Sequence, residues 1–140
     1  MIITEALNIE HRVFTNLFDQ VEDLLPTLTT LAEVKLLATL IERSLHSHAD
    51  VEQNLAFAAL DHALKDKGRI DRLYEDHEEI DAALKQAQRA RNLAEGRRLL
   101  KTAIGASRAH FLREEKDIFP LLEQVLQPDT LQALGHARVQ

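Results

Sequence analysis

The sequence predicts an all-α protein, folded as an antiparallel up-down-up-down four-helix bundle with a short C-terminal helix. Apolar residues recur every three or four positions almost throughout the 140-residue chain, which is the period of a helix with one buried face. Only four glycines and three prolines interrupt this pattern, so few turns are expected. Because short turns place successive helices antiparallel, residues 1–140 are expected to form a single bundle domain.

The first helix is expected over residues 4–25, because Pro26 and the threonines after it favour a turn. The second should begin at Thr30, whose hydroxyl can cap the helix while the side chain of Glu33 reaches back. This helix should fade near Ala63, before the polar segment of the next turn.

The third helix should follow a polar turn at Lys65–Gly68. Asn92, with Glu95 three residues later, is a plausible cap for the fourth helix. Pro120 should kink or end that helix. Asp129 is then expected to cap a short final helix that runs through residue 134 and ends near Gly135. The expected inward-facing stripes are Leu7, His11, Phe14, Phe18, Val21 and Leu25; Val34, Leu37, Ile41, Leu45, His48, Glu52, Leu55 and Ala59; Ile70, Leu73, His77, Ile80, Leu84 and Ala87; and Leu99, Ala103, Ala106, His110, Glu114, Ile118 and Leu121.

Composition narrows the possible functions. The net charge of −6 argues against a nucleic-acid partner, which usually requires a basic face. The absence of cysteine excludes disulfides, thiolate metal sites and cysteine nucleophiles, so a transition metal would need nitrogen and oxygen ligands. Such ligands suit iron, manganese or zinc. No signal peptide or membrane span is recognised, and a cytoplasmic location is expected.

Six polar residues interrupt stripes that should otherwise face the core. Each helix contributes at least one of them, and two helices each contribute a histidine followed four residues later by a glutamate. That spacing places both side chains on one helix face, about 5–6 Å apart at Cβ, so both can reach one ion. The six candidate metal ligands are His11, His48, Glu52, His77, His110 and Glu114.

The six candidates are also expected at one depth in the bundle. In an antiparallel pair, residues at the same height lie equally far from the turn that joins the helices. The sequence position midway between the candidates of one helix and those of the next falls beside an expected turn in all three cases. The order His, then HxxxE, occurs twice, and Phe57 and Leu60 match Phe119 and Leu122 at equal offsets. A dinuclear site on the resulting pseudo-twofold axis would give each metal two histidines, with the carboxylates bridging.

The alternative is a metal-free polar network inside the bundle. Each histidine alone, and each HxxxE pair alone, is more often structural or solvated than a ligand. However, an ionised carboxylate buried without a partner costs several kcal/mol, so two of them in one apolar layer favour bound cations. The joint placement of the six residues therefore favours the metal interpretation.

The remaining histidines have weaker claims. His46 is two residues from His48 and so points to a different face, where it is expected to be exposed or to support a ligand. His62 and His136 lie near helix ends and are expected on the surface. Asp117 lies seven residues after His110 on the same face, where either a hydrogen bond to a ligand histidine or a solvated position is possible.

At these residues the sequence resembles the hemerythrin-like family of HHE cation-binding domains. The resemblance is carried by Glu10-His11, by His48-Ala-Asp-Val-Glu52, by Asp76-His77-Glu78 and, most strongly, by residues 110–120, in the family's order. The family implies a carboxylate-bridged pair of non-haem iron ions. By this resemblance Glu52 and Glu114 bridge, His11 and His48 bind one iron, and His77 and His110 bind the other.

One position departs from the oxygen-carrying members of that family. They have a fifth histidine one turn before the residue that matches His77, and this chain has Leu73 there. An open position is therefore expected on the iron bound by His77 and His110. Tyr74 could approach it, or could simply be a half-buried aromatic between helices. The other di-iron bundle class, which is ferritin-like, uses Glu-x-x-His motifs, and this sequence contains none.

Three functions remain open from the sequence. The first is a di-iron protein that binds or senses oxygen, peroxide, nitric oxide or iron itself. The second is a peroxidase-like or oxidase-like enzyme at the same metals, and the third is a metal-free interaction bundle. The metal and ligand set favours a binding protein over a dedicated enzyme, and the sequence identifies no protein partner.

Overall fold

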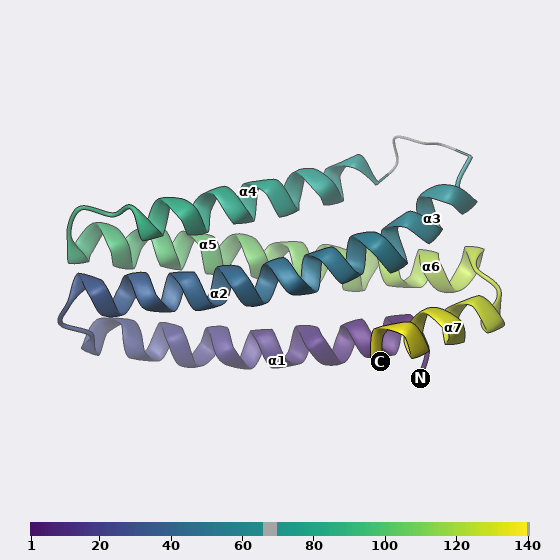
Figure 1. Cartoon of the computed structure of the whole chain (residues 1–140), viewed down its shortest axis with the longest axis horizontal. Helices are drawn as coiled ribbons and strands as arrows, with labels where there is room; N and C mark the ends of the chain where they lie inside the picture. The colour runs from purple at the N-terminus through teal and green to yellow at the C-terminus, as the bar shows by residue number, and fades with distance from the viewer. Residues whose placement is uncertain (66–69, 140) are drawn as a thin grey trace.

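Four long antiparallel helices and a short C-terminal helix make up the fold (Figure 1). The computed structural model describes residues 1–65 and 70–139, and this part of the chain contains no strand. α4 packs against both α2 and α5, and α7 lies along α1. The expected all-α bundle with a short final helix is therefore confirmed. The long helices are α1 (Ile3–Leu24), α2 (Leu31–Val51), α4 (Asp71–Gln88) and α5 (Leu93–Arg113), and the last is α7 (Pro128–Val139).

The helix starts follow the capping chemistry of the sequence. Thr30 accepts a hydrogen bond from the backbone N–H of Glu33, whose carboxylate accepts one from the N–H of Thr30. Asn92 caps α5 by accepting a hydrogen bond from the N–H of Glu95. A 3₁₀ turn, η1 (Leu25–Thr27), follows α1 and contains Pro26. Both predicted caps are confirmed.

Two of the long helices pass through a π-helical turn that the sequence did not predict. α2 continues into η2 (Glu52–Phe57) and α3 (Ala58–Ala63), while α5 continues into η3 (Glu114–Ile118) and α6 (Phe119–Val125). A π turn contains an extra residue compared with an α turn, so it rotates the helix beyond it. Both π turns begin at a candidate glutamate.

This rotation corrects the predicted stripes beyond each glutamate. The expected Leu55, Ala59, Ile118 and Leu121 are only half-buried. The residues one position later take the core positions, because the extra residue moves the buried face by one place. In α5 itself, Ala103 and His110 are buried as expected, but Ala106 is exposed and Ser107 is buried in its place. The side chains buried in place of the expected ones are Ala56, Leu60, Phe119 and Leu122.

The predicted end of the last helix was also wrong. Of the two effects expected of Pro120, it does not end its helix, since it lies in the first turn of α6, which continues directly from η3. α7 runs past Gly135 to Val139, and Asp129 lies within its first turn rather than ahead of it. Gly135 allows α7 to lie close to the backbone at the start of the chain, since a Cβ there would be 2.1 Å from the carbonyl oxygen of Met1.

Two apolar clusters lie on either side of the candidate ligands. The cluster toward η1 contains Phe18, Ile41 and Leu100, and the cluster toward α3 contains Phe57 and Leu122. The six polar residues occupy the layer between these clusters. Of the turn expected at residues 65–68, only residue 65 is among the residues that the structure describes. Among the helices of the described chain, none is both long and apolar enough to cross a membrane.

Candidate metal centre

The structure brings all six candidate residues into one buried layer. α1 supplies His11 and α4 supplies His77. α2 and α5 each supply a histidine, and the glutamate four residues later is the first residue of the π turn that continues each helix. The exposed fraction of His77 is 10%, and that of each other candidate is 3% or less. The expected convergence at one depth is thus observed.

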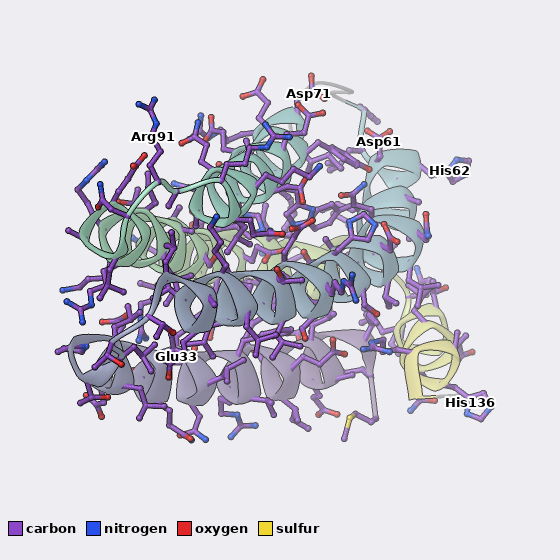
Figure 2. The ribbon with its side chains drawn as sticks, turned by 60° about the vertical axis from the view of Figure 1, so that its left-hand side comes forward. Glu33, Asp61, His62, Asp71, Arg91 and His136 are labelled. Carbon is purple, nitrogen blue, oxygen red and sulfur yellow. The ribbon has the colours of Figure 1, made fainter. Side chains whose placement is uncertain are left out.

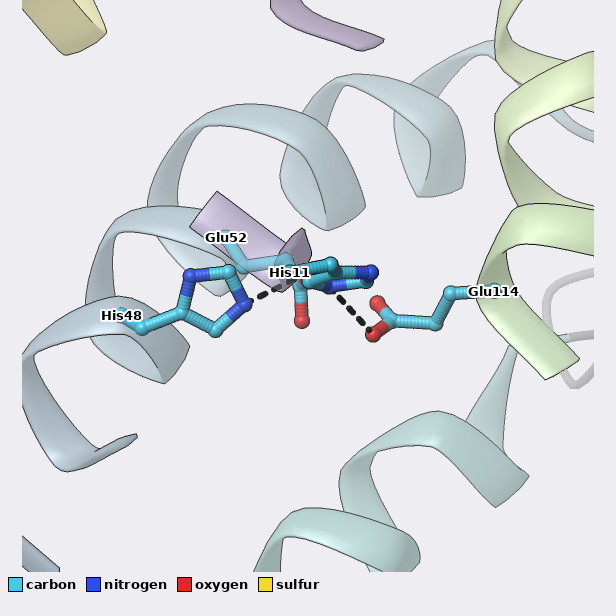
Figure 3. Close-up of side chains that lie close together, drawn as sticks. All are labelled: His11, His48, Glu52 and Glu114. Carbon is cyan, nitrogen blue, oxygen red and sulfur yellow. Dashed lines mark ion pairs between the residues drawn. The ribbon is translucent and has the colours of Figure 1, made fainter. Parts of the chain in front are cut away.

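Their ligating atoms form two overlapping groups. His11 and His48 join Glu52 and Glu114 in the first group, and each residue places one nitrogen or oxygen within 4.8 Å of the others (Figure 3). His77 joins His110 and the same two glutamates in the second group, to the same limit. Both carboxylates are therefore shared between two histidine pairs.

Each carboxylate lies between histidines of different pairs. Glu52 lies 3.4 Å from Nε2 of His48 and 3.1 Å from Nε2 of His77. Glu114 lies 3.5 Å from Nε2 of His11 and 3.0 Å from Nε2 of His110. Four Nε2 atoms thus face two carboxylates across one small space, which is the arrangement that a bridged metal pair requires.

Most of these polar atoms make no hydrogen bond. Nine side-chain nitrogen and oxygen atoms in the described residues are buried without a hydrogen-bond partner, and eight of them belong to the six candidates. They include all four carboxylate oxygens and Nε2 of His11, His48 and His110. Unsatisfied buried polar groups are rare and costly, so their concentration here indicates a group that the protein atoms themselves do not supply.

The electrostatics of the layer indicate a site built for positive charge. Burial lowers the pKa of His110, but contacts with Glu114 and Glu52 outweigh burial and raise that pKa to about 10. Burial likewise opposes ionisation of His48, yet neighbouring carboxylates raise its pKa to about 9. Burial raises the pKa of Glu52, but the four surrounding histidines hold it well below its usual value. Protons on the histidines or bound cations can balance the carboxylates, so a metal must displace protons.

Comparison with known proteins agrees with this geometry. Residues 2–122 match the hemerythrin HHE cation binding domain. The chain belongs to this family. No curated protein and no solved structure matched the chain. The matched range contains all six candidates, whereas α7 lies beyond it.

An outer ring of side chains orients the histidines of this HHE domain. Nδ1–H of His48 donates to Glu10 at 2.7 Å, and Nδ1–H of His110 donates to Asp76 at 2.8 Å. A hydrogen bond at Nδ1 leaves the Nε2 lone pair free for a metal and holds the ring in place. Glu10 directly precedes His11 in the chain, and Asp76 directly precedes the candidate histidine of α4.

The ring is completed by the residues that follow each candidate glutamate. Nδ1–H of His77 donates to Gln53 at 2.7 Å. At the related position, Glu115 lies 3.6 Å from Nδ1 of His11. The ring therefore repeats the pseudo-twofold order of the ligands, but it is neutral at Gln53 and acidic at Glu115. Sequence reasoning missed these four residues, although each is adjacent to a candidate ligand in the chain.

Aromatic rings enclose the layer in the same symmetric way. Phe111 stacks on His11 with ring centroids 3.9 Å apart, and Phe57 stacks on His77 at 5.5 Å. Phe119, the counterpart of Phe57, lies 5.3 Å from His11. These rings hold the imidazoles in place by packing. The π turns make this contact possible, since they rotate both phenylalanines inward.

The other histidines lie away from the centre. His46 is 68% exposed and lies 3.4 Å from Asp50, as expected for its different helix face. His62 and His136 are on the surface, and both point outward in Figure 2. Asp117 is exposed. Asp76, and not this aspartate, binds the free nitrogen of a ligand histidine.

The region of the missing fifth histidine is apolar. Leu73 is 3% exposed and belongs to the apolar cluster toward α3. Tyr74 is half-buried, with its ring 5.5 Å from Phe57 in an edge-on arrangement. A cavity of about 230 Å³ lies between α2 and α4, and its lining includes Tyr74, His77 and His110. This side of the HHE domain has space beside the candidate ligands.

Proposed function

We propose that this HHE domain binds two iron ions in a carboxylate-bridged centre. The observation that carries the proposal is the set of eight buried nitrogen and oxygen atoms without hydrogen bonds, gathered on five of the six candidate side chains. His11 and His48 would hold one ion, and His77 and His110 the other. Glu52 and Glu114 would bridge, because both carboxylates belong to both groups of potential ligands.

The ligand chemistry supports iron. The donors are imidazole nitrogens and carboxylate oxygens, a set that suits non-haem iron, and the chain has no cysteine that would favour softer ions. A bound iron pair would supply Lewis acidity and reversible electron transfer at the centre. The protein's part is to hold the donors in place through the outer ring and to keep the layer dry.

The proposed role is to bind or sense a small ligand such as oxygen, peroxide or nitric oxide, or to report iron itself. The support is the cavity of about 230 Å³ that reaches His77 and His110. Leu73 offers no donor atom on that side of the centre, so the metal there would keep a position for an exogenous ligand. A binding role requires nothing further from the described residues.

A second candidate function is a peroxidase-like or oxidase-like activity at the same metals. The observation that favours it is Tyr74, which lines the same cavity as His77 and is half-buried. A cavity of this size exceeds what a diatomic molecule needs, so a reducing substrate could reach the centre. Turnover of peroxide with a reductant, above the rate of free iron, would support this function, and the absence of turnover would remove it.

Metal analysis of protein purified anaerobically, without added metal, tests the main proposal. We expect about two irons per chain, as for bridged pairs in general. His48→Ala should lose bound metal, and the matched variant His46→Ala should keep it, because His46 is exposed and belongs to neither group of potential ligands. A site emptied by His46→Ala and left full by His48→Ala would contradict the assignment.

The metal-free interaction bundle predicts a different result. In that case the layer is a polar network, no variant changes the metal content, and chelators leave stability unchanged. The eight atoms without hydrogen bonds weigh against this alternative, since a polar network is stable only when its members are satisfied.

A further inference from the structure

We propose that the cavity between α2 and α4 is the route by which a hydrated divalent cation reaches the centre. We further propose that His46 and Asp50 make the first contact with that cation. This inference rests on the proposed metal centre and deepens it. Three features of the cavity support the route: the charge at its rim, the donors inside it and its size.

The rim of the cavity is acidic. Asp50 and Glu78 are exposed lining residues, and Glu42 and Asp81 are half-buried ones. Asp81 pairs with the ammonium of Lys85, which lies outside the cavity, and Asp50 lies 3.4 Å from the imidazole of His46. No lysine or arginine lines this cavity. Clefts lined by one sign of charge concentrate ions of the opposite sign.

Donor atoms without hydrogen bonds lie at the buried side of the same cavity. His48 and His110 both belong to its lining, and Nε2 of each is buried without a partner. Their exposed fractions are 3% and 1%. Because these two histidines belong to different ligand pairs, a cation arriving through the cavity meets a donor of each half of the centre. The acidic rim is therefore connected to real ligand positions.

His46 and Asp50 repeat the ligand spacing at the surface. They are four residues apart on α2, as His48 and Glu52 are, and lie 3.4 Å from one another. Exposed fractions of 68% and 59% leave them accessible from water. A nitrogen and a carboxylate at this distance can hold a divalent cation weakly, and weak binding allows onward transfer to the buried set.

The size of the cavity fits a cation that still carries water. Six waters at their share of liquid volume occupy roughly 180 Å³, and the cavity measures about 230 Å³. A second hollow beside the start of α1 offers a contrast. Its lining includes Arg12 beside Glu5 and Glu115 and none of the six candidate ligands, so a cation there would meet mixed charge and no donor of the centre.

The test measures how fast Co²⁺ alone binds to the metal-free full chain. Stopped-flow absorbance follows the loading rate, and equilibrium titration counts the bound ions. Asp50→Asn/Glu78→Gln should slow loading about three- to tenfold at low salt, the effect of weakened steering. The difference should shrink above about 0.5 M salt, where charges are screened. His46→Gln should also slow loading, and none of these variants should change the number of ions bound.

The matched control is Asp23→Asn/Asp129→Asn, which removes two exposed carboxylates that do not line the cavity. It should load at the wild-type rate. Ala49→Leu provides a steric arm, because Ala49 lines the cavity and is only half-buried. It should slow loading at both salt concentrations, and circular dichroism of the metal-free variant verifies its fold.

The outcomes separate the two proposals. If the wild-type chain does not bind two ions at equilibrium, the proposed centre is wrong. If all variants bind two ions but load at the wild-type rate, the centre stands and this route is wrong. Equal slowing in the cavity variants and in the distant control would also overturn the route, since it would show an effect of net charge alone.

Discussion

Asp76 contacts one candidate ligand histidine and two arginines. Its carboxylate accepts hydrogen bonds from Nδ1–H of His110 at 2.8 Å and from Nε–H of Arg113 at 3.1 Å. Its other oxygen lies 2.9 Å from Nε of Arg72. Burial raises the pKa of Asp76, but His110 and Arg113 outweigh burial and hold that pKa below its usual value. The carboxylate therefore stays ionised and fixes the imidazole that faces Glu114.

Replacing this carboxylate tests its orienting role. Asp76→Asn should lower metal affinity about 10- to 100-fold, the usual effect of losing a partner of a ligand histidine. Competition with a chelator of known affinity measures the change. Glu79→Gln is the control, because Glu79 is 61% exposed and also pairs with Arg72. Equal losses in both variants would show that the effect comes from Arg72 and not from the histidine.

At the same scale, helix phase was enough to choose between neighbouring candidate ligands from the sequence. His48 and His46 differ in helix phase, and the structure buries the first and exposes the second. The partners of the histidines could not be chosen this way. Gln53 and Glu10 lie 24 and 38 residues from the imidazoles that they bind, so only the packing of helices brings them together.

At the scale of helices, the π turns decide which residues surround the centre. Each begins at a candidate bridging glutamate, and each places a phenylalanine in the core at the sixth position. An α-helical continuation would leave Phe57 and Phe119 turned away by about one residue, roughly 100°. The phase of helix faces beyond Glu52 was therefore mispredicted, because periodicity assumes a constant number of residues per turn.

The contact of α7 with α1 provides a test at this scale. Gly135→Ala should lower the free energy of unfolding by about 1–3 kcal/mol, because its Cβ would overlap backbone that cannot move independently. Gly105→Ala is the matched control. It is exposed in α5 with nothing within 4 Å of the added Cβ, and it should stabilise by about 0.5–1 kcal/mol. Urea unfolding of both variants measures the difference, and a harmless Gly135→Ala would contradict the observed packing.

α7 also connects to the centre through charge. Arg138 donates to Glu10, which in turn accepts the hydrogen bond of His48. Burial raises the pKa of Glu10, but His48 and Arg138 together hold it below its usual value. A helix beyond the matched family range thus helps keep one orienting carboxylate ionised. Neither the length of this helix nor its contact could be predicted, since its own pattern is short and weak.

For the whole molecule, the polar layer opposes folding unless its charge is balanced. Two apolar clusters lie on either side of it, and two buried carboxylates lie inside it. Ions that bind the folded state alone stabilise it by mass action, by about 2.7 kcal/mol when free metal is 100 times the dissociation constant. Metal binding to this layer would therefore be coupled to the stability of the fold.

Chelation measures that coupling. Removing metal should lower Tm by roughly 5–10 °C, from the stability change above and the usual shift per kcal/mol. Glu52→Ala/Glu114→Ala should show no chelator dependence. A wild-type Tm that does not respond to a chelator would support the metal-free bundle.

The sequence by itself determined the four long helices, the caps at Thr30 and Asn92, and the six residues that converge. These features depend on local rules: a period of three to four residues, a side chain that reaches its own backbone, and a histidine and glutamate stacked on one face. Whether the six bind metal stays a prediction. Only the tertiary structure decided the phase shift at the π turns, the partners of the histidines, the cavity and the passage of α7 across Gly135. Each of these depends on groups distant in the chain, whose meeting is set by the packing of whole helices.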